Sequence, residues 1–211
     1  MRLRGYNYSD NGAYFLTMCA YERRFLFGGV VQGEVQLSEA GRMVKEQWHD
    51  LPNRFDGVEL DEFVVMPNHV HGILGLCGRS EAGLRPTSLV LTASGEDKLR
   101  AYGTLPETVG RVVQAFKSLT TNAYIHGVRQ LGWPAFNRHV WQANYYDHVV
   151  RNEHALGLIR EYIFTNPQQW SDDLENPQAT GTDDVGAFIR AMESVDIDAG
   201  EHKVRPYGGG A

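Results

Sequence analysis

Two apolar runs of the chain are joined by a short turn in the stretch Val64-Val65-Met66-Pro67-Asn68-His69-Val70-His71-Gly72-Ile73-Leu74. Proline and asparagine are typical turn residues, so the stretch predicts two paired strands, residues 59–66 and 69–76. Successive side chains of a strand point to opposite faces, so His69 and His71 project side by side. Two imidazoles on a stiff strand suit a divalent cation and leave coordination positions open. Taken alone, the pair also fits histidines that only make local hydrogen bonds.

A second informative element runs from Asn152 to Pro167. Asn152 is a typical N-cap, apolar residues recur at helical spacing, and Pro167 disfavours helical geometry in the residue before it. We therefore expect a helix that ends at Asn166. Tyr162 and Asn166 are about one turn apart and share one face of that helix. The pattern alone also fits an ordinary amphipathic helix with a half-buried tyrosine.

The other apolar patterns predict an α+β domain. We expect a strand over residues 14–21, helices over residues 38–50 and 106–126, and another strand over residues 139–146. With the two paired strands, this order suits a ferredoxin-like antiparallel sheet with helices packed on it. Residues 78–104 show little periodicity and are rich in Gly, Ser, Thr and charged residues, which predicts a long mobile loop.

Charge is distributed unevenly along the chain, whose formal net charge is −6. Residues 171–211 carry nine acidic and three basic side chains, so the part before them is neutral and can still display a local basic surface. We therefore expect one domain over residues 5–170 followed by an acidic tail over residues 171–211. Such a tail is typical of a solvated extension. An autoinhibitory strand mimic or a partner-binding arm is the alternative.

Length and composition fit one compact domain, since 211 residues with 42% hydrophobic content can bury a sizeable core. Cys19 and Cys77 form no Cys-x-x-Cys pattern, so we expect free reduced thiols. The sequence shows neither the pattern of a signal peptide nor an apolar run of membrane length. We expect a cytoplasmic protein with no membrane partner.

Three motifs follow one another in a fixed order: Pro67-Asn68-His69-Val70-His71, then residues 141–151 with the sequence WQANYYDHVVR, then residues 161–167 with the sequence EYIFTNP. Together they resemble the REP-associated tyrosine transposases, members of the single-tyrosine HUH superfamily, in which U is a bulky apolar residue, here Val70. The resemblance also covers residues 12–17 and 115–118, and it extends from about Gly5 to Trp170.

The resemblance implies a role for each motif residue. His69 and His71 correspond to metal ligands, and Tyr162 corresponds to the nucleophile. Asn166 lies where relatives place a third polar ligand, often glutamine, which is one methylene longer. Mg²⁺ or Mn²⁺ is the expected ion, because labile coordination and oxygen ligands suit phosphate chemistry.

The resemblance also implies the reaction and its substrate. We expect single-stranded or hairpin-forming DNA to be cleaved and rejoined through a 5′-phosphotyrosine. A phenol has an ordinary pKa of about 10, so attack needs help from a bound cation. Lys117, on the predicted long helix, and Arg151 are candidate DNA contacts, although both also fit an ordinary solvated surface. A monomer is favoured over a dimer.

Two other functions fit the same motifs. One is a domesticated protein that binds hairpin DNA without cleaving it. The other is a metal-dependent hydrolase in which His69 and His71 activate water and Tyr162 is only structural. The presence of both histidines and the tyrosine favours the transposase over a binding protein that has lost its catalytic residues.

Overall fold

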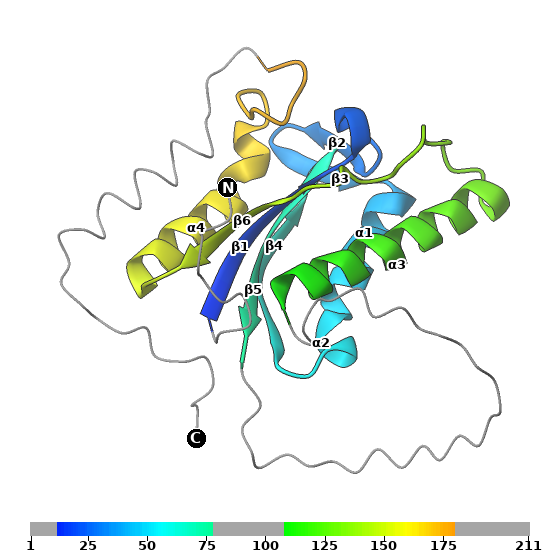
Figure 1. The fold of residues 1–211 in the computed structure, drawn as a ribbon. Coiled ribbons are helices and arrows are strands. Elements are labelled where there is room, and N and C mark those ends of the chain that lie inside the picture. Colours follow the sequence, from blue (N-terminus) through cyan, green and yellow to red (C-terminus); the bar gives the residue numbers. More distant parts are fainter. Residues whose placement is uncertain (1–11, 78–107, 180–211) are drawn as a thin grey trace, which may run out of the picture.

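The computed structural model describes residues 12–77 and 108–179, which build an antiparallel sheet between layers of helix (Figure 1). The sheet has the order β4-β5-β1-β6, formed by β1 (Gly12–Cys19), β4 (Val58–Val65), β5 (His69–Leu76) and β6 (Tyr146–Val150). A separate hairpin consists of β2 (Gly28–Val31) and β3 (Glu34–Leu37). The helices are α1 (Glu39–His49), α2 (Leu51–Arg54), α3 (Val109–Gln130) and α4 (Glu153–Thr165), with short 3-10 helices η1 (Tyr21–Arg23) and η2 (Asn166–Gln169).

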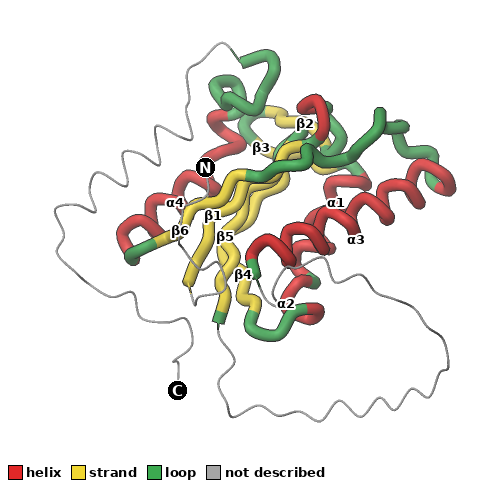
Figure 2. Tube along the Cα trace, in the orientation of Figure 1, coloured by secondary structure: helices red, strands yellow, loops and turns green. Residues whose placement is uncertain are grey.

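The connectivity confirms the predicted ferredoxin-like α+β fold. Within the described part of the chain, β1, α1, β4, β5, α3 and β6 follow one another as strand-helix-strand-strand-helix-strand. Figure 2 shows α1 and α3 on one face of the sheet and α4 on the other. The larger apolar core lies beneath α1 and α3, and a smaller core joins the opposite face to α4.

The turn at Pro67 and Asn68 joins β4 to β5, as the sequence predicted. The central strand β1 runs antiparallel to β5, so that Cys19 pairs with His69 and Thr17 pairs with His71. The two histidines therefore occupy the first residues of β5, beside the end of the central strand. Because His71 and Thr17 are direct partners, their side chains share one face of the sheet.

Helix α4 begins as predicted, because the side chain of Asn152 accepts a hydrogen bond of 2.7 Å from the backbone N–H of Ala155. It ends at Thr165, one residue before the predicted end, and η2 continues it. The guanidinium of Arg160 binds both carboxylate oxygens of Asp61, which lies in an irregular part of β4. This bidentate ion pair holds α4 against the edge strand β4.

The strand predicted over residues 139–146 is wrong: the strand is β6, which begins only at Tyr146. Before it, Trp141 makes a single bridge to Ala20 and buries its indole, which donates to Thr120 Oγ1. Lys117 Nζ binds the carbonyl oxygens of residues 142 and 144. These side-chain contacts replace the ladder that a regular strand would make.

Several predicted features lie outside the described residues. They are the loop over residues 78–104, the first residues of the helix predicted over residues 106–126, the start of the predicted domain, and the acidic tail beyond residue 179. The first part of the tail is described. There Asp173 and Asn176 are buried, so packing continues past the expected domain end at residue 170.

Candidate metal centre

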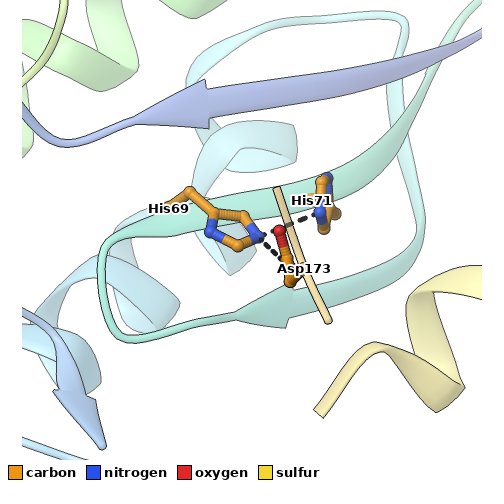
Figure 3. A group of neighbouring side chains, drawn as sticks. All are labelled: His69, His71 and Asp173. Carbon is orange, nitrogen blue, oxygen red and sulfur yellow. Dashed lines mark hydrogen bonds and ion pairs between the residues drawn. The ribbon is translucent and has the colours of Figure 1, made fainter. Parts of the chain in front are cut away.

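His69 and His71 are fully buried and face each other at the start of β5. Their Nε2 atoms are 3.0 Å apart (Figure 3). A polar neighbour contacts the Nδ1 atom of each ring and fixes its orientation. His69 Nδ1 lies 2.8 Å from Asn68 Oδ1, and His71 Nδ1 lies 2.8 Å from Thr17 Oγ1. Such support on the far nitrogen is typical of imidazoles that bind metals.

The surroundings of Asn68 fix which nitrogen of His69 carries hydrogen. The amide nitrogen of Asn68 donates to the carbonyl oxygens of Arg23 and Glu175, so its Oδ1 must face His69. Since Oδ1 only accepts, His69 Nδ1 carries the hydrogen and donates to it. His69 Nε2 then presents a lone pair toward His71.

Both imidazoles are uncharged at neutral pH. Burial, the neighbouring His71 and Arg23 lower the pKa of His69 well below its usual value. Burial lowers the pKa of His71 to about 3. Neutral imidazole is the form that binds a metal ion. The Nε2 separation also fits, since two ligands about 2.1 Å from one ion at a right angle are about 3.0 Å apart.

A buried carboxylate completes this group. Asp173 is fully buried, and its Oδ2 lies 3.6 Å from His69 Nε2. Its Oδ1 accepts the backbone N–H of Glu175 at 2.7 Å, which orients Oδ2 toward the histidines. Burial keeps His69 neutral, so the contact is not an ion pair. One ligand atom from each of His69, His71 and Asp173 lies within 4.8 Å of the others, and the three residues could together hold a metal ion.

Asp173 belongs to a segment that covers the histidines, residues 170–176, which we call the cap segment. Glu175 holds this segment through an ion pair of 3.0 Å with Arg23 and through the thiol of Cys19, which donates to it at 3.2 Å. Burial and the nearby Glu175 raise the pKa of Cys19, so the thiol keeps its proton. The ring centroid of Trp170 lies 6.0 Å from that of His69.

Tyr162 projects from α4 onto the same group. Its ring centroid lies 5.3 Å from that of His71 and 6.1 Å from that of Phe15. The residue is 6% exposed, and its hydroxyl is buried. The structure therefore brings the predicted nucleophile and the two predicted imidazole ligands together, although they come from α4 and β5.

Asn166, the predicted third ligand, is also fully buried, at the first position of η2. Within the part of the chain that the structure describes, neither its amide nitrogen nor its amide oxygen makes a hydrogen bond. A buried carboxamide without partners is costly, which is consistent with a ligand that an ion would satisfy. Its role as a ligand stays a prediction.

The two predicted DNA contacts lie in different places. Arg151 follows the end of β6 where Val150 pairs with Ala13, whereas the metal centre lies at the other end, where Tyr146 pairs with Thr17. The structure therefore does not bring Arg151 to the metal centre. Lys117 lies on α3, near the segment that leads into β6.

Comparison with known proteins shows similarity to a bacterial protein over most of the chain. An uncharacterized protein of Haemophilus influenzae, strain Rd, is 37% identical over 176 residues, which covers 82% of this chain and 89% of the relative. No protein-family model matches the chain. Among the described helices, none combines the length and the apolar character needed to cross a membrane.

Solved structures give more distant likenesses. One is a REP-associated tyrosine transposase bound to a REP hairpin, with 18% identity, a TM-score of 0.49, and coverage of 80% of this chain and 74% of the other. A second is a candidate transposase from Deinococcus radiodurans R1, with 21% identity, a TM-score of 0.42, and coverage of 78% of this chain and 95% of the other.

Proposed function

The chain belongs to the same family as the uncharacterized Haemophilus influenzae protein, and we propose that it is a metal-dependent transposase or nuclease that cleaves single-stranded, hairpin-forming DNA through a tyrosine. The observation that carries the proposal is the meeting of Tyr162 with two neutral, buried imidazoles whose ring nitrogens face one another. A histidine pair with a purely structural role needs no neighbouring phenol.

The residues assigned to the ion are His69, His71 and Asp173, with Asn166 as a further candidate. When bound, Mg²⁺ or Mn²⁺ would polarise a non-bridging phosphate oxygen and offset the charge that develops during attack. The protein's own part is to keep both imidazoles neutral and oriented. Asn68 and Thr17 do so by binding the two Nδ1 atoms, which leaves both Nε2 atoms facing the candidate site.

Tyr162 acts as the nucleophile in this proposal. Its oxygen forms a bond to the scissile phosphorus while the bond from phosphorus to the 3′ oxygen breaks, and the phenol loses its proton as the 3′ oxygen gains one. The products are a 5′-phosphotyrosine and a free 3′-hydroxyl. Because one phosphodiester replaces another, a second 3′-hydroxyl can reverse the step and join strands without ATP.

The cap segment must move before DNA can react. Tyr162 is 6% exposed, and both histidines and Asp173 are fully buried, so no phosphate reaches them in this arrangement. The cap segment is held by one partly exposed ion pair and a few hydrogen bonds around Glu175. It is therefore the part of the structure above the histidines that can move most easily. We infer that strand entry displaces residues 170–176, so that Asp173 would hold the ion only before DNA enters and a phosphate oxygen of the strand would take its place.

A denaturing gel tests the proposed function. Labelled single strands that form a hairpin are incubated with the protein and Mn²⁺ or Mg²⁺, and the gel separates free from protein-linked DNA. The proposal predicts a metal-dependent, protein-linked product. Cleavage without linkage would indicate a hydrolase, and binding without cleavage would indicate a domesticated binding protein.

A further inference from the structure

A second concave site lies on the other side of the sheet from α4, between α3 and the segment that precedes β6. It encloses about 310 Å³. Its basic lining consists of Lys117, Arg138 and His139, and the rest is formed by hydroxyl, amide and apolar groups. No acidic side chain is among the described residues that line it. The pocket is therefore suited to an anion.

Lys117 is built into the wall of this pocket. Its ammonium donates to the carbonyl oxygen of Gln142 at 2.8 Å and to that of Asn144 at 2.9 Å, which uses two of its three N–H groups. Its Nζ also lies 5.5 Å from the ring centroid of Tyr145. Burial lowers the pKa of Lys117 to about 8, so it is mostly charged at neutral pH. In the described part of the chain no carboxylate pairs with it.

Arg138 is the second cationic residue that lines the pocket. Its side chain is exposed and makes no ion pair within the described residues. Its backbone has a φ of 61°, in the left-handed region. For a residue other than glycine this conformation costs about 1 kcal/mol or more, and such residues cluster at functional sites. The neighbouring His139 packs edge-on against Tyr21, with ring centroids 5.3 Å apart.

Backbone hydrogen bonds join the pocket to the metal centre. The N–H of Gln142 donates to the carbonyl oxygen of Cys19 at 2.9 Å, and the N–H of Tyr21 donates to that of Val140 at 2.8 Å. Cys19 is the β1 partner of His69. The pocket and the metal centre thus lie at the same end of the sheet, joined by residues 19–21.

We propose that this pocket binds a phosphodiester group of the DNA strand that continues into the metal centre, with Arg138 and Lys117 as its cationic contacts. The proposal rests on the proposed function, because it assumes a nucleic-acid substrate. The proposal also gives the path of the DNA strand from the pocket to the metal centre. A strand held at Arg138 passes residues 19–23, where Cys19 and Arg23 hold the cap segment.

Binding of a labelled hairpin with single-stranded extensions, measured in EDTA so that no cleavage occurs, tests the proposal. Arg138→Gln removes one charge from an exposed side chain, so the fold is retained. Arg129→Gln is the matched control, since Arg129 is exposed on α3 and lies outside the pocket lining. We expect Arg138→Gln to weaken binding about fivefold and to reduce the slope of log K against log salt by about one, with no change for Arg129→Gln.

A second arm identifies the phosphate. Methylphosphonate linkages, which are uncharged, replace single phosphates along the extensions. A methylphosphonate at the phosphate that Arg138 contacts should weaken binding to the wild-type protein. The same linkage should not weaken binding to Arg138→Gln any further, because that variant already lacks the contact. The proposal would be overturned if Arg138→Gln and wild type had the same affinity and salt slope. It would also be overturned if the loss of affinity from Arg138→Gln simply added to the loss from the methylphosphonate at every linkage. If the wild-type protein binds DNA but forms no covalent product, the proposed cleavage is contradicted. The proposal that the pocket binds a phosphate is not affected by that result.

Discussion

Oδ2 of Asp173 lies 3.6 Å from Nε2 of His69, and both residues are fully buried. The carboxylate comes from a segment beyond the last long helix, whereas the imidazole opens β5. This arrangement would let the carboxylate and the imidazole bind one cation together. The candidate metal site therefore draws on the cap segment as well as on the strand that carries the histidines.

Asp173→Asn should weaken Mn²⁺ binding about tenfold, because a neutral carboxamide replaces an anionic ligand of the same shape. The introduced carboxamide would keep an oxygen for the N–H of Glu175, so the segment should stay in place. Binding is measured by electron paramagnetic resonance of free Mn²⁺, without DNA. Asp172→Asn is the control, since Asp172 is exposed. Equal affinities for the two variants would remove Asp173 from the ligand set.

Asn166→Ala tests the predicted third ligand. If the carboxamide binds the ion, the variant should need about tenfold more Mn²⁺ for half-maximal cleavage, whereas His71→Ala should lose cleavage at every concentration. The difference follows from ligand strength, since water can partly replace a neutral carboxamide oxygen. A Mn²⁺ titration like that of the wild type would show that Asn166 is not a ligand.

Glu175→Gln should loosen the cap segment, because it removes the charge that pairs with Arg23. A partly exposed ion pair contributes up to about 1 kcal/mol, so we expect single-turnover cleavage at saturating Mn²⁺ to rise by about two- to fivefold. Glu161→Gln, an exposed position on α4, serves as the control. A slower reaction in Glu175→Gln would show that strand entry does not require release of the cap segment.

The ion-free protein should lose stability as pH falls from 7 to 5. The folded-state pKa values of His69 and His71 are lowered, so over this range the unfolded chain binds protons at an ordinary pKa of about 6.5 that the folded protein does not bind. Each buried imidazole should therefore remove about 1 kcal/mol of unfolding free energy per pH unit below pH 6. Denaturant unfolding in EDTA measures this loss. His71→Asn should show a shallower decline, and an unchanged slope would contradict the burial of a neutral imidazole.

Local patterns predicted the parts of the site that lie on regular elements. Alternation along β5 placed His69 and His71 side by side, and the spacing and cap of α4 placed Tyr162 one turn before Asn166. Asp173 was not predicted, because its burial depends on contacts of Glu175 with residues far away in the sequence, which leave no periodic pattern. Its acidic neighbours instead suggested a solvated tail.

The same limit explains the error before β6. Residues 139–146 alternate like a strand, yet the burial of Trp141 and the hydrogen bonds from Lys117 hold the chain in an irregular path. Tertiary contacts of this kind override local preference for a strand. They also form the wall of the basic pocket, so the mispredicted segment is the one that carries the further binding site.

Peptide mapping of the covalent product identifies which tyrosine is the nucleophile. Trypsin should release residues 161–190 as one peptide in which Tyr162 is the single tyrosine, whereas Tyr145 and Tyr146 fall in residues 139–151. After reaction with hairpin DNA and Mn²⁺ and nuclease trimming, mass spectrometry should find a nucleotide phosphate on the 161–190 peptide and none in Tyr162→Phe. A product on residues 139–151, or one that persists in Tyr162→Phe, would show that Tyr162 is not the nucleophile.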